Sequence, residues 1–310
     1  MIVALLAGFG AISLLTFLVP FLVMAFLWRP QDLKKKYQCE WALVTGSSSG
    51  IGRVLTEKLC AQGLNVVMVA LDDALLAASH KEIAAKFPDV QVRKCGCDLS
   101  KDGYMTPIRK STDDINVALV FNNAGFITTG MFADVAIERH MANYECNATC
   151  ALRITHHFLN KMLDSGTKGL IAFTSSPAGA MCSPFASIYG STKAFLTEFA
   201  MSLAPEVKFN GIDVVVVHPS PVASNFYNSV HKISSIQMFQ NTARGPENIV
   251  NYLLASAGRT VVCEQGYYCL AVRGLLLKVL DVALMANLAT AAIHLMPDYR
   301  KVTVARKKSK

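Results

Sequence analysis

Charged residues are scarce in this sequence: Asp, Glu, Lys and Arg make up 17 % of its 310 residues, against roughly 25 % in average soluble proteins. So little charge argues against a disordered chain and against a long coiled coil. The 19 glycines follow no fixed period, which excludes a collagen-like chain. No repeat or low-complexity linker interrupts residues 40–260. We therefore expect one main folded domain.

Metal-ligand spacing is also missing. The nine cysteines are scattered, and the pair Cys95 and Cys97 lacks the two-residue spacer of a zinc knuckle. His156 and His157 are adjacent, so they point to different faces of a helix. We expect no metal site, and thiols that stay reduced in a cytosol-facing compartment. The net charge of +8 comes without interleaved aromatic residues, which favours a membrane surface over nucleic acid.

The first 28 residues contain 23 apolar residues and no charge. A helix of this length rises about 42 Å, more than a hydrocarbon core of about 30 Å. A cleaved signal peptide would show basic residues before a shorter apolar run and a small-residue cleavage site, and none is present. We predict an uncleaved anchor over 1–28 and, because Arg29 and the lysines at 34–36 follow it, a cytosolic body. Pro20 favours a kink, and a hairpin that enters from one side stays open.

The remaining positive charge is concentrated in the last eleven residues. Lys307 and Lys308 occupy the fourth and third positions from the end, an arrangement that resembles the dilysine retrieval signal of endoplasmic-reticulum membrane proteins. A basic tail that touches anionic lipid heads is the alternative. We predict localisation in the endoplasmic reticulum membrane, with the main domain facing the cytosol.

Strand-like apolar runs alternate with amphipathic helical segments along the body. This pattern predicts an α/β fold, a doubly wound parallel sheet covered by helices on both faces, over residues 41–265. A basic linker at 29–40 precedes it. The expected strands are 41–44, 65–70, 90–95, 117–121, 169–173 and 212–217. The expected helices are 51–62, 74–87, 137–163 and 189–208.

An apolar helical extension with the basic tail follows at 266–310. Its segment 279–296 is rich in Ala and Leu and contains one charge, Asp281. At 18 residues this segment could barely span a bilayer, lie in the interface or cover a substrate channel, and packing against the core is the fourth possibility. The low-charge segment around Met238 and Phe239 is expected beside an apolar substrate.

A glycine-rich turn joins the first strand to the following helix. It reads Thr45-Gly46-Ser47-Ser48-Ser49-Gly50-Ile51-Gly52, with the spacing Gly-x-x-x-Gly-x-Gly. Glycines permit a tight turn and let the backbone approach a pyrophosphate, which binds the free N–H groups at the helix N-terminus. We expect a dinucleotide here. The expected contacts are Gly46, Ser48, Ser49, Gly50, Ile51 and Gly52.

Four further features occur in order behind this turn. Asp72 follows the second strand, Asp98 the third, and Asn122-Asn123-Ala124-Gly125 the fourth. Tyr189 and Lys193 then open a helix, with Ser176 thirteen residues before the tyrosine. In this order the chain resembles the short-chain dehydrogenase/reductase family over about residues 40–260. The resemblance implies a Rossmann-type fold and an oxidoreductase with a nicotinamide cofactor. The further cofactor contacts that it implies are Asp72, Asp98, Asn123, Tyr189 and Lys193.

Tyr189 and Lys193 are four residues apart, so they share one helix face. A free phenol has a pKa of about 10, and a neighbouring ammonium favours the phenolate and lowers that pKa toward neutrality. A phenol tuned in this way donates a proton to a ketone oxygen as hydride arrives, or removes one in the reverse direction. Ser176 can hold the same oxygen through its hydroxyl. The resemblance adds that Lys193 binds the nicotinamide ribose.

Asn147 admits two interpretations. Asn147-Ala148-Thr149 is the only N-glycosylation sequon in the sequence, and its use would place the domain in a lumen. In the family, an asparagine at this place in the long helix distorts the helix and holds a water that links the lysine to solvent. We favour the catalytic role, because the anchor and the tail both indicate the cytosol.

The choice between the two nicotinamide cofactors rests on conflicting positions. Relatives that use NADPH usually have an arginine where Leu71 stands, and NAD-dependent relatives often have an aspartate where Ala70 stands. Asp72 lies twenty residues beyond Gly52, near the spacing of a ribose-binding acid, or caps the next helix. Arg53 would suit a 2′-phosphate or a helix surface. We expect NADPH, with NADH as the alternative.

Within the family, the sequence from Ile188 to Phe195 is similar to the branch of 17β-hydroxysteroid dehydrogenases and very-long-chain 3-oxoacyl-CoA reductases. Pro219-Ser220-Pro221 departs from the usual Pro-Gly after the sixth strand, as that branch also does. The resemblance implies reduction of a ketone on a lipid-like substrate, a 3-oxoacyl-CoA or a steroid, in a candidate homodimer at a membrane. A 3-ketodihydrosphingosine reductase-like enzyme is one alternative, and a catalytically idle membrane scaffold is another.

Overall fold

The computed structural model describes residues 1–227 and 241–301. Its centre is a seven-stranded sheet in which every pairing is parallel and the strand order is β3-β2-β1-β4-β5-β6-β7. The order reverses between β1 and β4, which marks the switch point where doubly wound sheets bind their ligands. The strands are β1 Trp41–Thr45, β2 Asn65–Ala70, β3 Val92–Gly96, β4 Val117–Asn122, β5 Gly169–Thr174, β6 Ile212–His218 and β7 Val262–Glu264.

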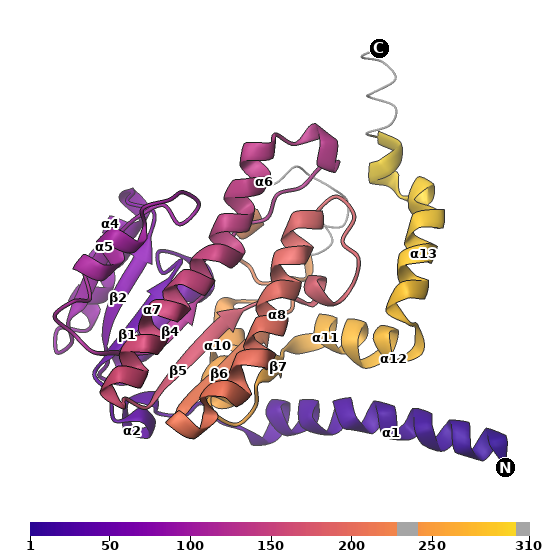
Figure 1. Cartoon of the computed structure of the whole chain (residues 1–310), viewed down its shortest axis with the longest axis horizontal. Helices are drawn as coiled ribbons and strands as arrows, with labels where there is room; N and C mark the ends of the chain where they lie inside the picture. Colours follow the sequence, from indigo (N-terminus) through magenta and orange to yellow (C-terminus); the bar gives the residue numbers. More distant parts are fainter. Residues whose placement is uncertain (228–240, 302–310) are drawn as a thin grey trace.

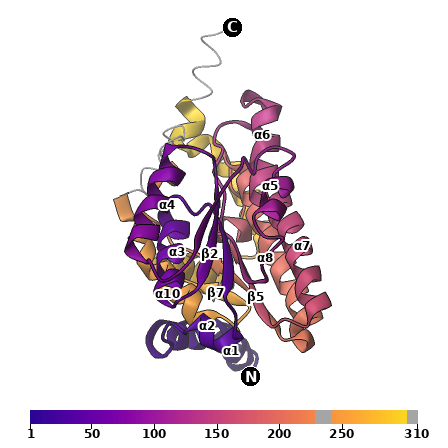
Figure 2. The ribbon, with the colours of Figure 1, turned by 90° about the vertical axis from the view of Figure 1, so that its left-hand side faces the viewer.

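Helices cover both faces of the sheet, with α3, α4 and α10 on one side and α5, α7 and α8 on the other (Figure 2). Successive residues of a strand point to opposite faces, so each strand supplies both layers. Leu43 joins the core beneath α7 and α8, whereas Val44 joins the core beneath α3 and α10. The helices are α3 Gly50–Ala61, α4 Ala74–Lys86, α5 Met105–Lys110, α6 Ile137–Tyr144, α7 Cys150–Ser165, α8 Ser187–Val207 and α10 Pro246–Ser256.

The predicted doubly wound sheet is confirmed, with corrections at particular elements. The strand expected at 90–95 begins two residues later, at Val92. The sequence does not predict the edge strand β7, because its three residues are too few to show a periodicity. The helix expected over 137–163 is not continuous: a π-helical turn, η3 (Glu145–Thr149), separates α6 from α7. Tertiary contacts of this turn, described below, explain the interruption.

The N-terminal helix extends away from the sheet (Figure 1). It consists of α1 (Ile2–Leu22) and a π-helical turn, η1 (Val23–Leu27), and is long and apolar enough to cross a membrane. The helix continues past Pro20 without reversing direction, which opposes the hairpin alternative. Near its C-terminal end, Phe21 and Met24 are buried against the body.

The linker at 29–40 is attached to the domain along its length. It contains a short helix, α2 (Leu33–Tyr37), and Leu33 is fully buried in the core. Gln31 Nε2 donates hydrogen bonds to three carbonyls at the C-terminal end of α10. These carbonyls have no partner within the helix itself. The N-terminal helix is therefore joined to the domain by packed and hydrogen-bonded residues.

The C-terminal extension is helical but broken. The helix expected over 279–296 is interrupted because Leu280 is extended and the Asp281 side chain caps the helix that follows. Among the residues of α13, Met285 alone is buried. The prediction that this segment packs against the core is therefore wrong. The elements are α11 Gly266–Cys269, η7 Leu270–Leu276, α12 Leu277–Val279, α13 Val282–Ala292 and η8 Ile293–Leu295.

The turn after β1 offers a test of the fold. A Cβ at Gly52 would lie 2.2 Å from the carbonyl oxygen of Gly46, a backbone atom that cannot rotate away. Gly52→Ala is therefore expected to lower the free energy of unfolding by about 1–3 kcal/mol, measured by chemical denaturation. The control is Gly10→Ala in α1, where the new Cβ meets no atom of the described residues within 4 Å. Equal stability of the two variants would contradict this packing.

Candidate active site

The expected site residues gather at the C-terminal ends of the central strands. The glycine turn follows β1, Asn123 follows β4 and Ser176 follows β5, and these strands are neighbours in the sheet. Tyr189 and Lys193 lie in the first two turns of α8. The topology therefore brings the predicted cofactor turn and the predicted catalytic residues to one edge of the sheet.

The glycine turn has the geometry of an anion site. Gly46 has a φ of +65°, a left-handed conformation that favours glycine. A Cβ there would also lie 2.9 Å from Ala124 Cα, so the turn packs against the segment after β4. Ser49 is the N-cap residue of α3, and within the described chain its side chain makes no capping hydrogen bond. The first N–H groups of α3 thus suit a pyrophosphate.

Asn123 connects this turn to the sheet through hydrogen bonds. Its Nδ2 donates to the Thr45 carbonyl at 3.1 Å, and its Oδ1 accepts from the Thr174 hydroxyl at 3.1 Å. Its backbone N–H donates to the Thr45 hydroxyl at 2.9 Å. Both ends of the Asn123 amide are therefore committed to protein groups. Its contact with a cofactor stays a prediction, and so do the contacts expected of the turn itself.

The two aspartates lie at the ends of β2 and β3, as expected. Asp72 is exposed and pairs with Lys94 Nζ at 3.1 Å. The N-cap of α4 is Asp73, whose carboxylate accepts a backbone N–H of the first turn, so the capping role considered for Asp72 is wrong. Asp98 Oδ1 accepts from the N–H and the hydroxyl of Ser100. Cofactor contacts of both aspartates stay predictions.

Arg53 is engaged by acidic residues of two helices. Its Nε lies 3.4 Å from Glu57 Oε1 in α3, and its Nη2 lies 2.5 Å from Glu82 Oε2 in α4. The helix-surface interpretation of Arg53 therefore holds, and its charge is already paired. Leu71, directly after β2, is 54 % exposed. The position where NADPH-dependent relatives usually carry a cation is thus open to solvent and apolar here.

Lys193 is buried, with 3 % of its surface exposed. Its Nζ donates to the Thr174 carbonyl at 2.8 Å and lies 5.6 Å from the centre of the Tyr189 ring. Removal from water disfavours the ammonium, so burial lowers the pKa of Lys193 to about 8. The four-residue spacing therefore predicts the proximity of the two side chains correctly.

The phenol of Tyr189 is buried as well, beside Ile127 and Phe226. Burial raises the pKa of Tyr189 above its ordinary value, and a hydrogen bond with Ser176 acts in the opposite direction. The expectation that Lys193 lowers this pKa is wrong for this structure. The ammonium lies over the ring and is bonded to Thr174, so desolvation of the phenol dominates.

Ser176 is held in place by the short helix that it begins. It is the N-cap of η4 (Pro177–Ala180), and its Oγ accepts from the Ala178 N–H at 3.2 Å. Because the oxygen accepts in this bond, the hydroxyl proton remains available to donate. This hydroxyl also acts to lower the pKa of the Tyr189 phenol, so the two groups lie near each other. The two groups can therefore act on the same substrate atom.

Asn147 lies in the π-helical turn between α6 and α7, the distortion that the family resemblance implies. Its Oδ1 accepts from the Phe126 N–H at 2.9 Å, and its Nδ2 donates to the Phe126 carbonyl at 2.9 Å. A Cβ on Gly125 would lie 3.0 Å from Asn147 Oδ1 and 3.5 Å from Lys193 Nζ, so the two side chains meet beside this glycine. Asn147 is 1 % exposed, which opposes glycosylation there.

A buried polar chain continues behind Lys193, and sequence reasoning misses most of it. The Lys193 carbonyl accepts from the hydroxyls of Ser175 and Thr197, at 2.6 and 3.0 Å. Thr197 Oγ1 lies 2.9 Å from His218 Nε2, and His218 Nδ1 lies 3.1 Å from Glu264 Oε1. Thr197 could be found from its place one helical turn after Lys193. His218 and Glu264 meet only because β6 pairs with β7 at this register.

Comparison with known proteins agrees with this geometry. A family model described as short chain dehydrogenase matches residues 40–233. A very-long-chain 3-oxoacyl-CoA reductase of Laccaria bicolor is 32 % identical over 222 residues, which are 70 % of this chain and 63 % of that relative. The match thus spans less than two thirds of the relative's length. A 7beta-hydroxysteroid dehydrogenase of Collinsella aerofaciens is 28 % identical over 186 residues, 60 % of this chain and 70 % of that protein.

A solved structure shares the fold as well. The short-chain dehydrogenase of Sphingobium yanoikuyae, in complex with NADPH, has a TM-score of 0.68 at 25 % identity. The match covers 76 % of this chain and 92 % of that chain. The family model spans more than half of the sequence and includes the glycine turn, Asn147, Ser176, Tyr189 and Lys193. This chain belongs to the short-chain dehydrogenase family.

Proposed function

We propose that this protein is a membrane-anchored, NADPH-dependent ketone reductase of a lipid-like substrate, with a 3-oxoacyl-CoA as the first candidate. The arrangement of Ser176 near the buried side chains of Tyr189 and Lys193, at the edge of the sheet, carries the proposal. The name of the Laccaria bicolor relative supports the substrate class. The Collinsella aerofaciens relative favours a steroid as the second candidate.

The residues divide the work of ketone reduction. A bound nicotinamide supplies the hydride that reaches the carbonyl carbon. Tyr189 delivers a proton from its Oη to the carbonyl oxygen, and Ser176 donates a hydrogen bond to the same oxygen. A raised pKa of Tyr189 suits this direction, because the phenol is protonated and ready to donate. Lys193, held by the Thr174 carbonyl, keeps its ammonium over the Tyr189 ring, and Asn147 and Lys193 Nζ both border Gly125.

Removal of the phenol hydroxyl tests the mechanism. Tyr189→Phe is expected to reduce turnover by about 10²- to 10⁴-fold, the usual contribution of a general acid. Nicotinamide binding, measured by cofactor fluorescence, should stay nearly intact because the glycine turn lies on another element. Tyr252→Phe in α10, on the opposite face of the sheet, is the control and should keep its activity. Wild-type turnover in Tyr189→Phe would exclude this mechanism.

A substrate panel separates the proposal from its alternatives. Purified full chain is assayed with 3-oxoacyl-CoA, steroid and ketosphingoid ketones in the presence of NADPH or NADH. Turnover of a ketosphingoid substrate alone would favour the 3-ketodihydrosphingosine reductase-like alternative. Intact nicotinamide binding without turnover of any ketone would favour the scaffold. A homodimer also stays a prediction.

The proposed preference for NADPH depends on the region after β2. Leu71→Arg would place a cation at an exposed position beside the predicted cofactor turn. We expect the NADPH/NADH ratio of kcat/KM to rise at least about tenfold, because a hydrogen bond to a charged group contributes about 1.5–3 kcal/mol. Leu75→Arg, at an exposed position in the first turn of α4, is the control and should leave the ratio unchanged. An unchanged ratio in both variants would show that the cofactor phosphate lies elsewhere.

The proposed location is the endoplasmic reticulum membrane, with the catalytic domain in the cytosol. The apolar helix Ile2–Leu27 supports membrane attachment. The burial of Asn147 supports the cytosolic orientation, because it removes the sequon from use. The Lys307–Lys308 pair and the segment around Met238 and Phe239 lie outside the described residues.

The tail can be tested in cells. Replacing Lys307 and Lys308 with Ser should let the protein leave the endoplasmic reticulum while it stays membrane-bound, because the apolar helix outweighs a few surface lysines. Replacing Lys301 and Arg306 removes similar charge and should not change the location. Confocal microscopy with an antibody against the catalytic domain measures both and leaves the end of the chain free. A catalytic domain that the antibody cannot reach after selective plasma-membrane permeabilisation would overturn the orientation.

A further inference from the structure

The free part of the N-terminal helix is short for a membrane span. From Phe17 onward the helix packs on the body: a Cβ on Gly274 would lie 2.5 Å from the Phe17 ring, and Phe21 and Met24 are buried. Contacts of the helix reach further toward its N-terminus, because α12 lies against α1 and Ser13 and Leu14 are half-buried. Residues 1–12 therefore project alone, over about 18 Å at 1.5 Å per residue. A hydrocarbon core is about 30 Å thick. A helix that crosses it must draw the adjoining surface of the body into the membrane.

That adjoining surface is the C-terminal extension. Its exposed side chains are mostly apolar, and Val279 is 82 % exposed. Lys278 and Asp281 are its charged residues between 275 and 296, and they lie close together at the junction of α12 and α13. The large apolar side chains that it exposes are Leu275, Val279, Val282, Leu284, Leu288, Leu295 and Met296.

The two apolar helices run in different directions. Figure 1 shows α13 lying across the direction of α1. In a bilayer that α1 crosses, α13 therefore runs parallel to the membrane plane. At 11 residues α13 is too short to span, but its length suits a helix that lies in the interface.

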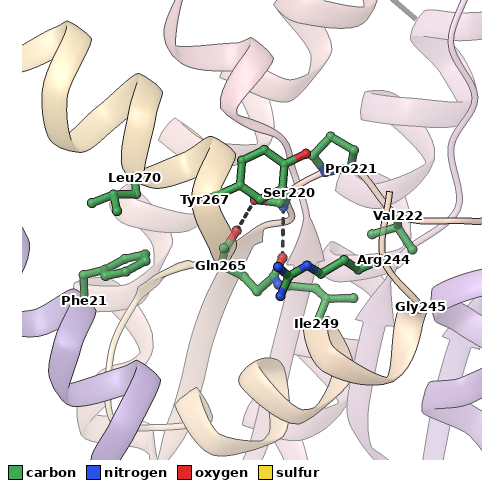
Figure 3. A pocket seen from close by; sticks show the side chains of 11 residues that line it. Phe21, Ser220, Pro221, Val222, Arg244, Gly245, Ile249, Gln265, Tyr267 and Leu270 are labelled. Atoms are coloured by element: carbon green, nitrogen blue, oxygen red, sulfur yellow. Dashed lines mark hydrogen bonds between the residues drawn. The ribbon is translucent and has the colours of Figure 1, made fainter. Parts of the chain in front are cut away.

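The extension is fixed to the body and to the anchor. Arg273 Nε lies 2.5 Å from Glu264 Oε1, which is buried beside His218. Phe21 of the anchor and Leu270 of η7 lie next to each other in the wall of a cavity of about 270 Å³ (Figure 3). The position of the extension relative to α1 is thus set by packing. A membrane that surrounds α1 is therefore also next to the extension.

We propose that residues 270–295 form a second membrane element, which lies in the cytosolic interface of the bilayer beside α1. The bilayer is the occupant of this apolar surface, because the extension that carries it packs against α1, with Gly274 next to the Phe17 ring and α12 in contact with the helix. Lys278 reaches the headgroups, since its long side chain extends toward water from such a position, and the Asp281 carboxylate stays at the cap of α13. A consequence that rests on the proposed function is that a lipid-like ketone reaches the domain directly from the membrane.

Photolabelling by lipid tests this proposal. The full chain is placed in nanodiscs of phosphatidylcholine and phosphatidylserine that contain a phospholipid with a diazirine on its acyl chain. After irradiation, mass spectrometry maps the labelled residues. We expect label on 1–12 and on 275–296, and none on α6, whose Ile137 and Met141 are each 57 % exposed and control for apolar exposure alone.

A paired variant sharpens the result. Leu284→Asn with Leu288→Asn should reduce labelling of 275–296 several-fold while labelling of 1–12 is unchanged, and circular dichroism checks the fold. Ile137→Asn with Met141→Asn is the matched control and should leave both signals unchanged. Label on α1 without label on α13 would overturn the proposal, and so would crosslinks between α13 helices of two copies. The readout needs no turnover, so it is independent of the proposed reaction.

Discussion

The buried ammonium of Lys193 is the constraint on which the site depends. A charge taken out of water is costly unless it is hydrogen-bonded, and here the Thr174 carbonyl at the end of β5 accepts from Nζ. The backbone of the same residue is held from the other side, because Ser175 and Thr197 donate to its carbonyl. Strand β5, helix α8 and the π-helical turn that contains Asn147 therefore hold one another in position around this ammonium. A shift of any of them would leave a buried polar group without a partner.

Much of the fold could be predicted, because its central strands are apolar on both faces and alternate with helical patterns. The exceptions have physical causes. Strand β7 has only three residues, which are too few to show a periodicity. The break at Leu280 occurs because Asp281 caps the helix that follows, whereas in the sequence Asp281 is only a single charge within an apolar segment. From the sequence, Asp72 and Asp73 are equally suited to cap the next helix, and only the backbone geometry makes Asp73 the cap of α4.

In the candidate site, the residues could be predicted from the sequence, but their surroundings could not. The order of the motifs identifies Tyr189, Lys193 and their neighbours, since spacing decides which side chains share a helix face. Spacing does not reveal burial, so the direction of the Tyr189 pKa could not be predicted. The raised value nevertheless fits a proton donor better than the lowered one expected from the sequence, because a group must carry the proton that it delivers.

The polar chain behind Lys193 relates the site to the proposed membrane surface. It runs through Thr197 and His218 to Glu264, and Glu264 pairs with Arg273 of the extension. A buried carboxylate needs its cation, because breaking such a pair leaves an uncompensated charge. The extension therefore cannot leave the body without disturbing the groups that support helix α8. If the extension lies in the bilayer, the same contacts fix the orientation of the catalytic helix relative to the membrane, so anchoring and catalysis depend on one set of buried interactions.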